Sequence, residues 1–262
     1  MPPPMQHLFS LAGEAALGAA MQQQPLLAFD FDGTLAPIVA RPQDARIPPG
    51  VSARLKALTA QLPLAIVTGR SVADVRGRLG FEPTFITGNH GAEDPLDPAA
   101  TRARARSLDP LRARLEAAHG ELAAAGVTVE DKGVSLALHY RLARQREQAQ
   151  ACIERLLTPP DDALRIFGGK MVTNVTTHDA PDKAQAVASL VARCGVGCAV
   201  FAGDDLNDEP VFESAPPHWL TLRVGRGDAA SRARYFLDSP REMALLLDRM
   251  LAMLPPAPAS LS

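Results

Sequence analysis

Cysteine is scarce in this sequence of 262 residues, and the three that occur are Cys152, Cys194 and Cys198. No second pair of cysteines or histidines accompanies them, which excludes a zinc site built on such pairs and a disulfide framework. Unpaired thiols are typical of a reducing compartment, so we expect a cytoplasmic protein. The first residues lack the basic start of a secretory signal, in line with that expectation.

Long apolar runs and an excess of one charge are also absent. The best apolar stretch, Leu245–Leu254, is interrupted by Asp248 and Arg249, so the sequence offers no membrane-spanning segment. The formal net charge is −2, which argues against a nucleic-acid or anionic-membrane binder that works by bulk charge. Hydrophobic residues make up 47% of the chain, which is enough for a sizeable core and excludes wholesale disorder.

Short apolar runs followed by a polar residue occur three times. Runs that are apolar on both faces predict buried strands of a parallel sheet, and a helical pattern between the first two predicts a βαβ unit. Ligands bind at the carboxyl ends of such strands, so the polar residues are candidate site residues. The runs and their polar residues are Leu26–Phe29 with Asp30, Leu64–Val67 with Thr68, and Ala199–Ala202 with Asp204.

The middle of the chain has a different pattern. Two long helical patterns enclose an alternating stretch that turns near residues 131–133, and a further strand pair flanks Gly168 and Gly169. We predict an α/β protein with a Rossmann-like parallel-sheet core of residues 1–96 and 180–262. Residues 97–179 are predicted to form an inserted α/β domain, an antiparallel sheet with two helices. Near the C-terminus, Ser239–Glu242 predicts a capping box at the start of the last helix.

The strongest chemical signal is the segment Asp30–Leu35, in which Asp30 and Asp32 follow the first predicted strand. Carboxylates held together there repel each other and lose hydration, and a divalent cation removes that cost. Hard oxygen ligands suit Mg²⁺, which a substrate phosphate often completes. One carboxylate can then attack phosphorus while the other handles the proton. The structural alternative is a surface Asp-Gly turn. A calcium loop does not fit, because Leu35 and Arg41 replace its Gly and Glu.

Three further features extend this signal. Thr68 places a hydroxyl where it can donate to a phosphoryl oxygen, although a capping threonine in a turn is the alternative. Lys183 lies in the first turn of a predicted helix, where a cation is unfavourable, so a nearby anion is expected unless the lysine is simply exposed. The acidic segment Gly203–Glu209 fits a metal site, the alternative being a solvated loop.

Together these pieces resemble the haloacid-dehalogenase superfamily of aspartate-nucleophile phosphatases. The resemblance implies that Asp30 is the nucleophile and that Asp32 is the general acid and base. It implies that Thr68 and Lys183 hold the phosphoryl group. The metal ligands it implies are Asp30, Asp32 through its backbone carbonyl, Asp204, and Asp208 through water or indirect contacts.

Further segments are similar to trehalose-6-phosphate phosphatases, a family with this core and an inserted cap. They are Gly88–Glu93, Glu130–Gly133 with the following Ala137–Arg141, the loop Gly203–Glu209 and the late loop Val224–Ser231. The similarity covers nearly the whole chain after about residue 25. It implies Mg²⁺-dependent hydrolysis of trehalose 6-phosphate to trehalose and phosphate through an aspartyl-phosphate.

Substrate contacts are implied by the same resemblance, although Glu130 and Lys132 can equally form a charged hairpin tip. Two departures stand out: Asn174 replaces a usual Glu, and Ala184 replaces a usual Gly. Because Asn lacks the charge, a phosphatase for sucrose phosphate or a glycosyl phosphoglycerate stays open. So does a catalytically silent sugar-phosphate-binding module. The implied contacts are Gly69, Arg70, His90, Glu130, Lys132 and Asn174.

The expected partner is a small-molecule sugar phosphate. We expect neither nucleic acid nor a membrane as a partner, given the balanced charge and the interrupted apolar runs. The resemblance adds a trehalose-phosphate synthase as a pathway neighbour.

Overall fold

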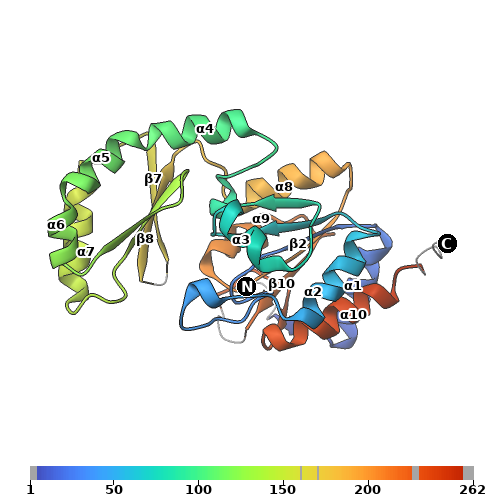
Figure 1. Ribbon diagram of the computed structural model, residues 1–262. Coiled ribbons are helices and arrows are strands. Elements are labelled where there is room, and N and C mark those ends of the chain that lie inside the picture. The colour runs from blue at the N-terminus through green and yellow to red at the C-terminus, as the bar shows by residue number, and fades with distance from the viewer. Residues whose placement is uncertain (1–4, 160, 170, 226–229, 256–262) are drawn as a thin grey trace. The chain divides into compact units, whose positions relative to one another are not determined.

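The computed structural model describes residues 5–159, 161–169, 171–225 and 230–255. The chain divides into two compact units, which Figure 1 shows as separate groups of helices and strands. Unit 1 consists of residues 1–91 and 182–262, and unit 2 consists of residues 92–181. Each unit has its own hydrophobic core.

Unit 1 is built on a seven-stranded parallel sheet with strand order β1-β11-β10-β9-β2-β3-β4. β2 lies at the point where the strand order reverses, and all four of its residues are buried, as the apolar run predicts. Phe29 at its end is in register with Ile66 of β3 and Ala202 of β9. The strands are β1 (Gln6–His7), β2 (Leu26–Phe29), β3 (Leu64–Val67), β4 (Phe85–Thr87), β9 (Ala199–Gly203), β10 (Leu220–Val224) and β11 (Tyr235–Leu237).

Helices of unit 1 bury one apolar stripe each. In α8, Ala186, Val187, Leu190 and Val191 recur at helical spacing and are buried, and the helix packs against β2 and β3. The helices are α1 (Leu11–Gln22), α2 (Pro49–Thr59), α3 (Val72–Leu79), α8 (Lys183–Cys194), α9 (Glu209–Ser214) and α10 (Met243–Ala252). Short 3-10 segments are η1 (Pro42–Asp44), η2 (Asn89–Gly91), η3 (Leu206–Asp208) and η4 (Pro240–Glu242).

The capping box predicted at Ser239–Glu242 is wrong. Ser239 precedes η4, but its side chain makes no capping hydrogen bond. Glu242 instead accepts the backbone N–H of Asp238 at 2.6 Å and lies 3.3 Å from Nε2 of His7. Glu242 therefore accepts a hydrogen bond from the backbone before the helix and contacts His7 of β1, so it does not form the reciprocal hydrogen bonds of a capping box.

Unit 2 contains a four-stranded antiparallel sheet with strand order β5-β6-β8-β7. Leu136 and Leu138 of β6 and Val175 of β8 lie in one cluster with apolar residues of the helices, so the helices cover one face of this sheet (Figure 1). The elements are α4 (Pro98–Ser107), α5 (Asp109–Ala117), α6 (His119–Ala124), β5 (Thr128–Asp131), β6 (Ser135–His139), α7 (Arg146–Leu156), β7 (Leu164–Gly169) and β8 (Val172–Thr177).

The predicted fold class is confirmed: a mixed α/β chain with a parallel-sheet core and a separate antiparallel sheet. One detail differs, because the first of the two long helices is three helices in succession, α4, α5 and α6. Pro110 in the first turn of α5 explains the first break, since proline has no N–H to donate to the carbonyl four residues earlier. Among the described residues, no helix is long and apolar enough to cross a membrane.

Candidate active site

Polar residues gather at one edge of the unit 1 sheet, because the chain leaves three neighbouring parallel strands there. Asp30 follows β2, Thr68 follows β3 and Asp204 follows β9. The strand order reverses between β2 and β9, and such a switch point is where open α/β sheets bind ligands. The sequence prediction of a site at this edge therefore has a structural basis in the topology.

The ammonium of Lys183 links two buried carboxylates. Its Nζ lies 2.8 Å from Oδ1 of Asp30 and 2.6 Å from Oδ1 of Asp208. The side chains of Lys183, Asp30 and Asp208 are 3%, 7% and 0% exposed, which removes the alternative of an ordinary surface lysine. Lys183 begins α8, and the anions that the unfavourable helix position predicted are these two carboxylates.

Charge in this cluster is unbalanced, and the pKa values reflect it. Burial raises the pKa of Asp30 well above its ordinary value; Lys183 opposes this effect, and the carboxylates of Asp208 and Asp204 add to it. Burial disfavours the charge on Lys183, but Asp208 and Asp30 outweigh it and raise the pKa of its ammonium. Three carboxylates thus face one lysine, so the cluster carries an excess of negative charge when all are ionised.

The carboxylates of Asp30, Asp204 and Asp208 form a cluster that could hold a divalent cation. Each offers an oxygen within 4.8 Å of the others. A Cβ added at Gly33 would lie 2.2 Å from Oδ2 of Asp204, so only glycine leaves room for that carboxylate. Asp208 accepts the backbone N–H groups of Asp204 and Asp205 with Oδ2, at 2.9 and 3.0 Å, and thereby shapes the loop. Hard oxygen ligands and surplus negative charge fit Mg²⁺.

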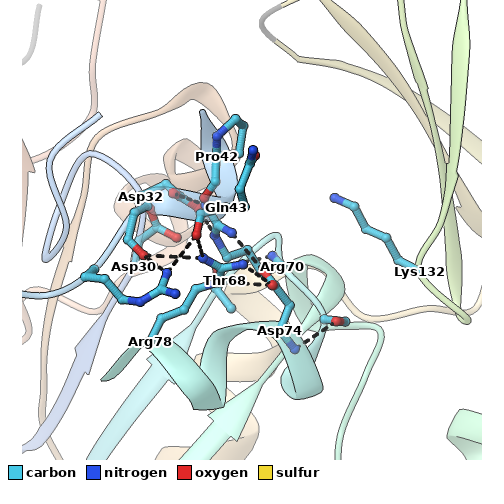
Figure 2. A network of polar contacts seen from close by, with 12 residues as sticks. Asp30, Asp32, Pro42, Gln43, Thr68, Arg70, Asp74, Arg78 and Lys132 are labelled. Atoms are coloured by element: carbon cyan, nitrogen blue, oxygen red, sulfur yellow. Dashed lines mark hydrogen bonds and ion pairs between the residues drawn. The ribbon is translucent and has the colours of Figure 1, made fainter. Parts of the chain in front are cut away.

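Asp32 lies outside this buried cluster and forms an ion pair with Arg70. Nε of Arg70 donates to Oδ2 of Asp32 at 2.6 Å, and Nη2 donates to Oδ1 at 2.7 Å. The side chain of Asp32 is 37% exposed, whereas that of Arg70 is 12% exposed. Figure 2 shows the guanidinium of Arg70 between Asp32 and Asp74. The two acids of the Asp30–Leu35 segment thus have separate cationic partners.

Thr68, Gly69 and His90 are brought together by backbone hydrogen bonds between two loops. The N–H of His90 donates to the carbonyl of Thr68 at 2.8 Å, and the N–H of Arg70 donates to Oγ1 of Thr68 at 3.2 Å. A Cβ added at Gly69 would lie 2.4 Å from Cε1 of His90, so Gly69 gives the imidazole room. Thr68 is fully buried.

In unit 2, the predicted residues Glu130 and Asn174 share a row across the sheet. The register places Glu130 opposite Ala137, Ala137 opposite Asn174, and Asn174 opposite Phe167. Because side chains alternate along strands, and Leu136, Leu138 and Val175 face the helices, this row lies on the other face. Sequence reasoning missed Phe167, whose ring has the guanidinium of Arg165 over it at 5.9 Å. Strand alternation is the signal that could have found it.

Glu130 contacts Lys132 and His139 within unit 2. Its Oε2 lies 3.8 Å from Nζ of Lys132 and 2.9 Å from Nε2 of His139. The side chains of Glu130, in β5, and Lys132, which follows the end of that strand, therefore lie close to each other.

Asp74 and Arg78 were also missed by sequence reasoning. Asp74 accepts from Nη1 of Arg70 at 2.7 Å and from Nε of Arg78 at 3.0 Å. The spacing of four residues from Arg70 to Asp74 to Arg78 was visible in the sequence and is typical of ion pairs on a helix face. The late loop Val224–Ser231 is described only in part, because residues 226–229 lie outside the described residues.

Comparison with known proteins decides the family. Residues 28–241 match the model of the trehalose-phosphatase family. The chain belongs to the trehalose-phosphatase family. The match extends over most of both units, which confirms the resemblance to trehalose-6-phosphate phosphatases seen in the sequence motifs.

Curated relatives of this trehalose-phosphatase family member include trehalose-phosphate phosphatases of mycobacteria. The protein of Mycobacterium tuberculosis (strain ATCC 25618 / H37Rv) is 32% identical over 259 residues, covering 93% of this chain and 66% of the relative. That of Mycobacterium marinum is 32% identical over 246 residues, covering 88% of this chain and 62% of the relative. The chain therefore spans less than two thirds of the length of these relatives.

Solved structures share the fold. The C-terminal domain of the Candida albicans trehalose-6-phosphate phosphatase has a TM-score of 0.75 at 20% identity, covering 96% of this chain and all of that one. A trehalose-6-phosphate phosphatase related protein has a TM-score of 0.71 at 23% identity, covering 87% of this chain and 98% of that one. At such identities the likeness concerns the fold alone.

Proposed function

We propose that this protein hydrolyses trehalose 6-phosphate to trehalose and inorganic phosphate, through a transient aspartyl-phosphate on Asp30. The observation that carries the proposal is the buried carboxylate of Asp30 at the carboxyl end of β2, with Nζ of Lys183 2.8 Å away. Membership of the trehalose-phosphatase family and relatives named as trehalose-phosphate phosphatases support the choice of substrate.

In the first half-reaction, a carboxylate oxygen of Asp30 forms a bond to phosphorus while the bond from phosphorus to the sugar oxygen breaks. Asp32 donates a proton to that sugar oxygen, which leaves as a hydroxyl. Lys183 and the hydroxyl of Thr68 hold the phosphoryl oxygens and offset the charge that they develop. Trehalose is the first product.

In the second half-reaction, Asp32 accepts a proton from a water molecule as the water oxygen bonds to phosphorus. The bond between phosphorus and Asp30 breaks, and inorganic phosphate leaves. Asp30 is again a carboxylate, and Asp32 is again protonated for the next cycle. One residue therefore acts as acid and then as base.

Mg²⁺, when bound, neutralises charge on the phosphoryl oxygens and on the acidic cluster. The residues that would hold it are Asp30 and Asp204 through their carboxylates and Asp32 through its backbone carbonyl. Asp208 would act indirectly, because its oxygens already serve Lys183 and the N–H groups of residues 204 and 205.

Unit 2, residues 92–181, is proposed as the cap that recognises the sugar, and unit 1 as the catalytic core. The sequence prediction placed the cap at residues 97–179 and the core at residues 1–96 and 180–262. The row from Glu130 through Asn174 to Phe167 combines a carboxylate, an amide and a ring on one sheet face. Carboxylates and amides bind sugar hydroxyls by hydrogen bonds. Gly69, Arg70, His90 and Lys132 complete the substrate contacts that the family resemblance implies.

Asn174 favours a second candidate, a phosphatase for another sugar phosphate such as sucrose phosphate or a glycosyl phosphoglycerate. It lies in the same cross-strand row as Glu130, and it is 6% exposed. An amide there provides both donors and acceptors but no charge. The choice of sugar is therefore the part of the proposal that a substrate panel tests most directly.

Cytoplasmic location is part of the proposal, together with a trehalose-phosphate synthase as the neighbour that supplies the substrate. The free thiols of Cys152, Cys194 and Cys198 support the reducing compartment.

The test is phosphate release from the purified full chain with trehalose 6-phosphate, sucrose 6-phosphate and glucosyl-3-phosphoglycerate, with Mg²⁺ and with a chelator. We expect trehalose 6-phosphate to give the highest kcat/KM and the chelator to abolish turnover. Equal kcat/KM values across the panel would refute the proposal that trehalose 6-phosphate is the preferred substrate. Turnover that survives complete removal of divalent cations would refute the metal requirement.

A variant tests the role of unit 2. We expect Glu130→Gln to raise KM for trehalose 6-phosphate about tenfold with kcat nearly unchanged, because uniform substrate binding is lost. Glu154→Gln on the exposed side of α7 is the matched control and should leave both constants unchanged. A fall in kcat alone would contradict a binding role for Glu130.

A further inference from the structure

Arg70 uses most of its hydrogen-bonding capacity inside unit 1. Its Nε and Nη2 donate to the two carboxylate oxygens of Asp32, Nη1 donates to Asp74 at 2.7 Å, and Nη2 also donates to the carbonyl of Pro42 at 2.8 Å. A guanidinium has five N–H donors, and these contacts engage four of them. The side chain is only 12% exposed. Little of it is left to bind a phosphoryl group or a sugar.

On the side away from Asp32, Arg70 is held by Asp74, which is itself paired with Arg78. Asp74 accepts from Arg70 with Oδ2 and from Nε of Arg78 with Oδ1 at 3.0 Å. Arg78 in turn donates to the carbonyl of Gln43, in the segment that also provides the carbonyl of Pro42. Four charged side chains of alternating sign, Asp32, Arg70, Asp74 and Arg78, thus run from the candidate site along α3 (Figure 2).

The body of Arg70 is fixed by neighbours on both site segments. Its guanidinium carbon lies 5.2 Å from the centroid of the Phe31 ring, which precedes Asp32. Its backbone N–H donates to Oγ1 of Thr68. Such two-point pairing of a guanidinium with a carboxylate fixes direction as well as distance, which a single-point lysine contact does not.

We propose that Arg70 is a positioning residue for Asp32 and that Asp74 holds Arg70 in place. The pair fixes the direction of the carboxylate that gives a proton to the leaving sugar oxygen and takes one from water. This inference rests on the proposed function and gives Arg70 a role other than the substrate contact that the family resemblance implies. A carboxylate has about four lone-pair sites, and Arg70 occupies one on each oxygen, so sites for the transferred proton remain.

The experiment compares two phosphate esters that differ in their need for a proton. The alkoxide of a sugar leaves poorly unless it is protonated, whereas p-nitrophenolate leaves without help. The variants are Arg70→Gln, Arg70→Lys and Asp74→Asn, with Asp32→Asn as the reference for lost proton transfer. Arg76→Gln is the matched control, because Arg76 lies on α3 with Asp74, its side chain is 55% exposed, and it lies 3.7 Å from the exposed Glu82.

We expect Arg70→Gln to lower kcat for trehalose 6-phosphate about 10- to 100-fold, a part of what removing a general acid costs. For p-nitrophenyl phosphate the loss in kcat/KM, which reports only the first half-reaction, should be less than about threefold, and KM for the sugar phosphate should stay nearly constant. Asp74→Asn should give the same pattern at about 3- to 10-fold, and Arg70→Lys should recover only part of the activity because it cannot pair at two points. Arg76→Gln should match the unchanged protein.

Equal losses in kcat/KM for both esters would overturn the positioning role, because kcat/KM reports only the step in which the leaving group departs. A rise in KM with kcat unchanged would overturn it too, since that is the signature of substrate contact. Circular dichroism and the thermal midpoint show whether each variant is folded. If Arg70→Gln does not fold, the ester ratio of Asp74→Asn decides the question. An unchanged protein that releases phosphate from neither ester would refute the proposed function and the positioning role with it. Activity with equal losses refutes only the latter.

Discussion

The two acids of the Asp30–Leu35 segment have opposite surroundings. Asp30 is 5% exposed and shares Lys183 with Asp208 in the interior of unit 1. Asp32 is more than a third exposed and pairs with Arg70, which is tied to α3 through Asp74. A buried cluster holds charge in a fixed place, and a half-exposed carboxylate can reach both solvent and substrate. The difference suits a nucleophile and a proton carrier respectively.

The largest expected effect is the loss of activity when Asp30 is replaced. Asp30→Asn should reduce phosphate release by at least about 1,000-fold, because an amide cannot form the covalent intermediate. The fold should persist, since the amide is nearly isosteric, and circular dichroism checks this. Asp44→Asn in the exposed η1 segment serves as the control and should keep full activity. Activity of Asp30→Asn within tenfold of the unchanged protein would remove Asp30 from the mechanism.

The next effect tests whether the Asp30 cluster depends on its single cation. Lys183→Met should lower the free energy of unfolding by about 3 kcal/mol, because two buried carboxylates lose their common partner. Urea denaturation measures it. Lys56→Met, at an exposed position of α2, should change the free energy of unfolding by less than about 0.5 kcal/mol. If Lys183→Met and Lys56→Met have the same free energy of unfolding, the contacts of Lys183 with Asp30 and Asp208 contribute nothing to stability.

Gly33 allows a smaller test of how closely the Asp204 carboxylate is packed. Gly33→Ala should cost about 1–2 kcal/mol for the positive φ of 82° and should also weaken stabilisation by Mg²⁺, because the added methyl displaces Asp204. Gly133→Ala is matched to it, with a φ of 84° and no atom within 4 Å of the added Cβ. Thermal midpoints with and without Mg²⁺ distinguish the two. Equal Mg²⁺ effects in both variants would contradict a metal site at Asp204.

The smallest expected effect concerns Asp74, which pairs with Arg70 and Arg78. Burial raises the pKa of Asp74, but hydrogen bonds from Arg78 and Arg70 outweigh it and lower the pKa below its ordinary value of 3.8. As the pH falls, the unfolded chain therefore takes up this proton first, and the stability that Asp74 contributes above about pH 4 is lost. Asp74→Asn should flatten the dependence of the unfolding free energy on pH between about 5 and 3, by less than about 1 kcal/mol. Urea denaturation over that range measures it, and identical slopes would contradict the pairing.

Short-range signals were enough for three neighbouring strands of the parallel core, β2, β3 and β9, and they made Lys183 a candidate for contact with an anion. The apolar runs before Asp30 and Thr68 predicted β2 and β3, because a short run that is apolar on both faces and ends at a polar residue suits a strand buried on both faces. Lys183 was informative for a physical reason: a cation in the first turn of a helix is unfavourable unless an anion lies nearby or the side chain is exposed, and two carboxylates lie within 3 Å.

Partners across the fold were beyond the sequence. Nothing local indicates that Arg70 turns to Asp32, 38 residues earlier, although its spacing to Asp74 and Arg78 was visible. The capping box at Ser239 failed for the same reason, because Glu242 is taken by the Asp238 N–H and lies beside His7. Local rules predict which contacts are available, and tertiary structure decides which of them form.

A reciprocal pair of hydrogen bonds lies at the start of α8, where the chain passes from unit 2 to unit 1. The N–H of Gln185 donates to Oδ1 of Asp182 at 2.9 Å, and Oε1 of Gln185 accepts the N–H of Asp182 at 3.0 Å. The chain re-enters unit 1 at Asp182, one residue before Lys183. These two hydrogen bonds fix the start of α8 where the chain re-enters unit 1, and so they fix the position from which the Lys183 ammonium reaches Asp30.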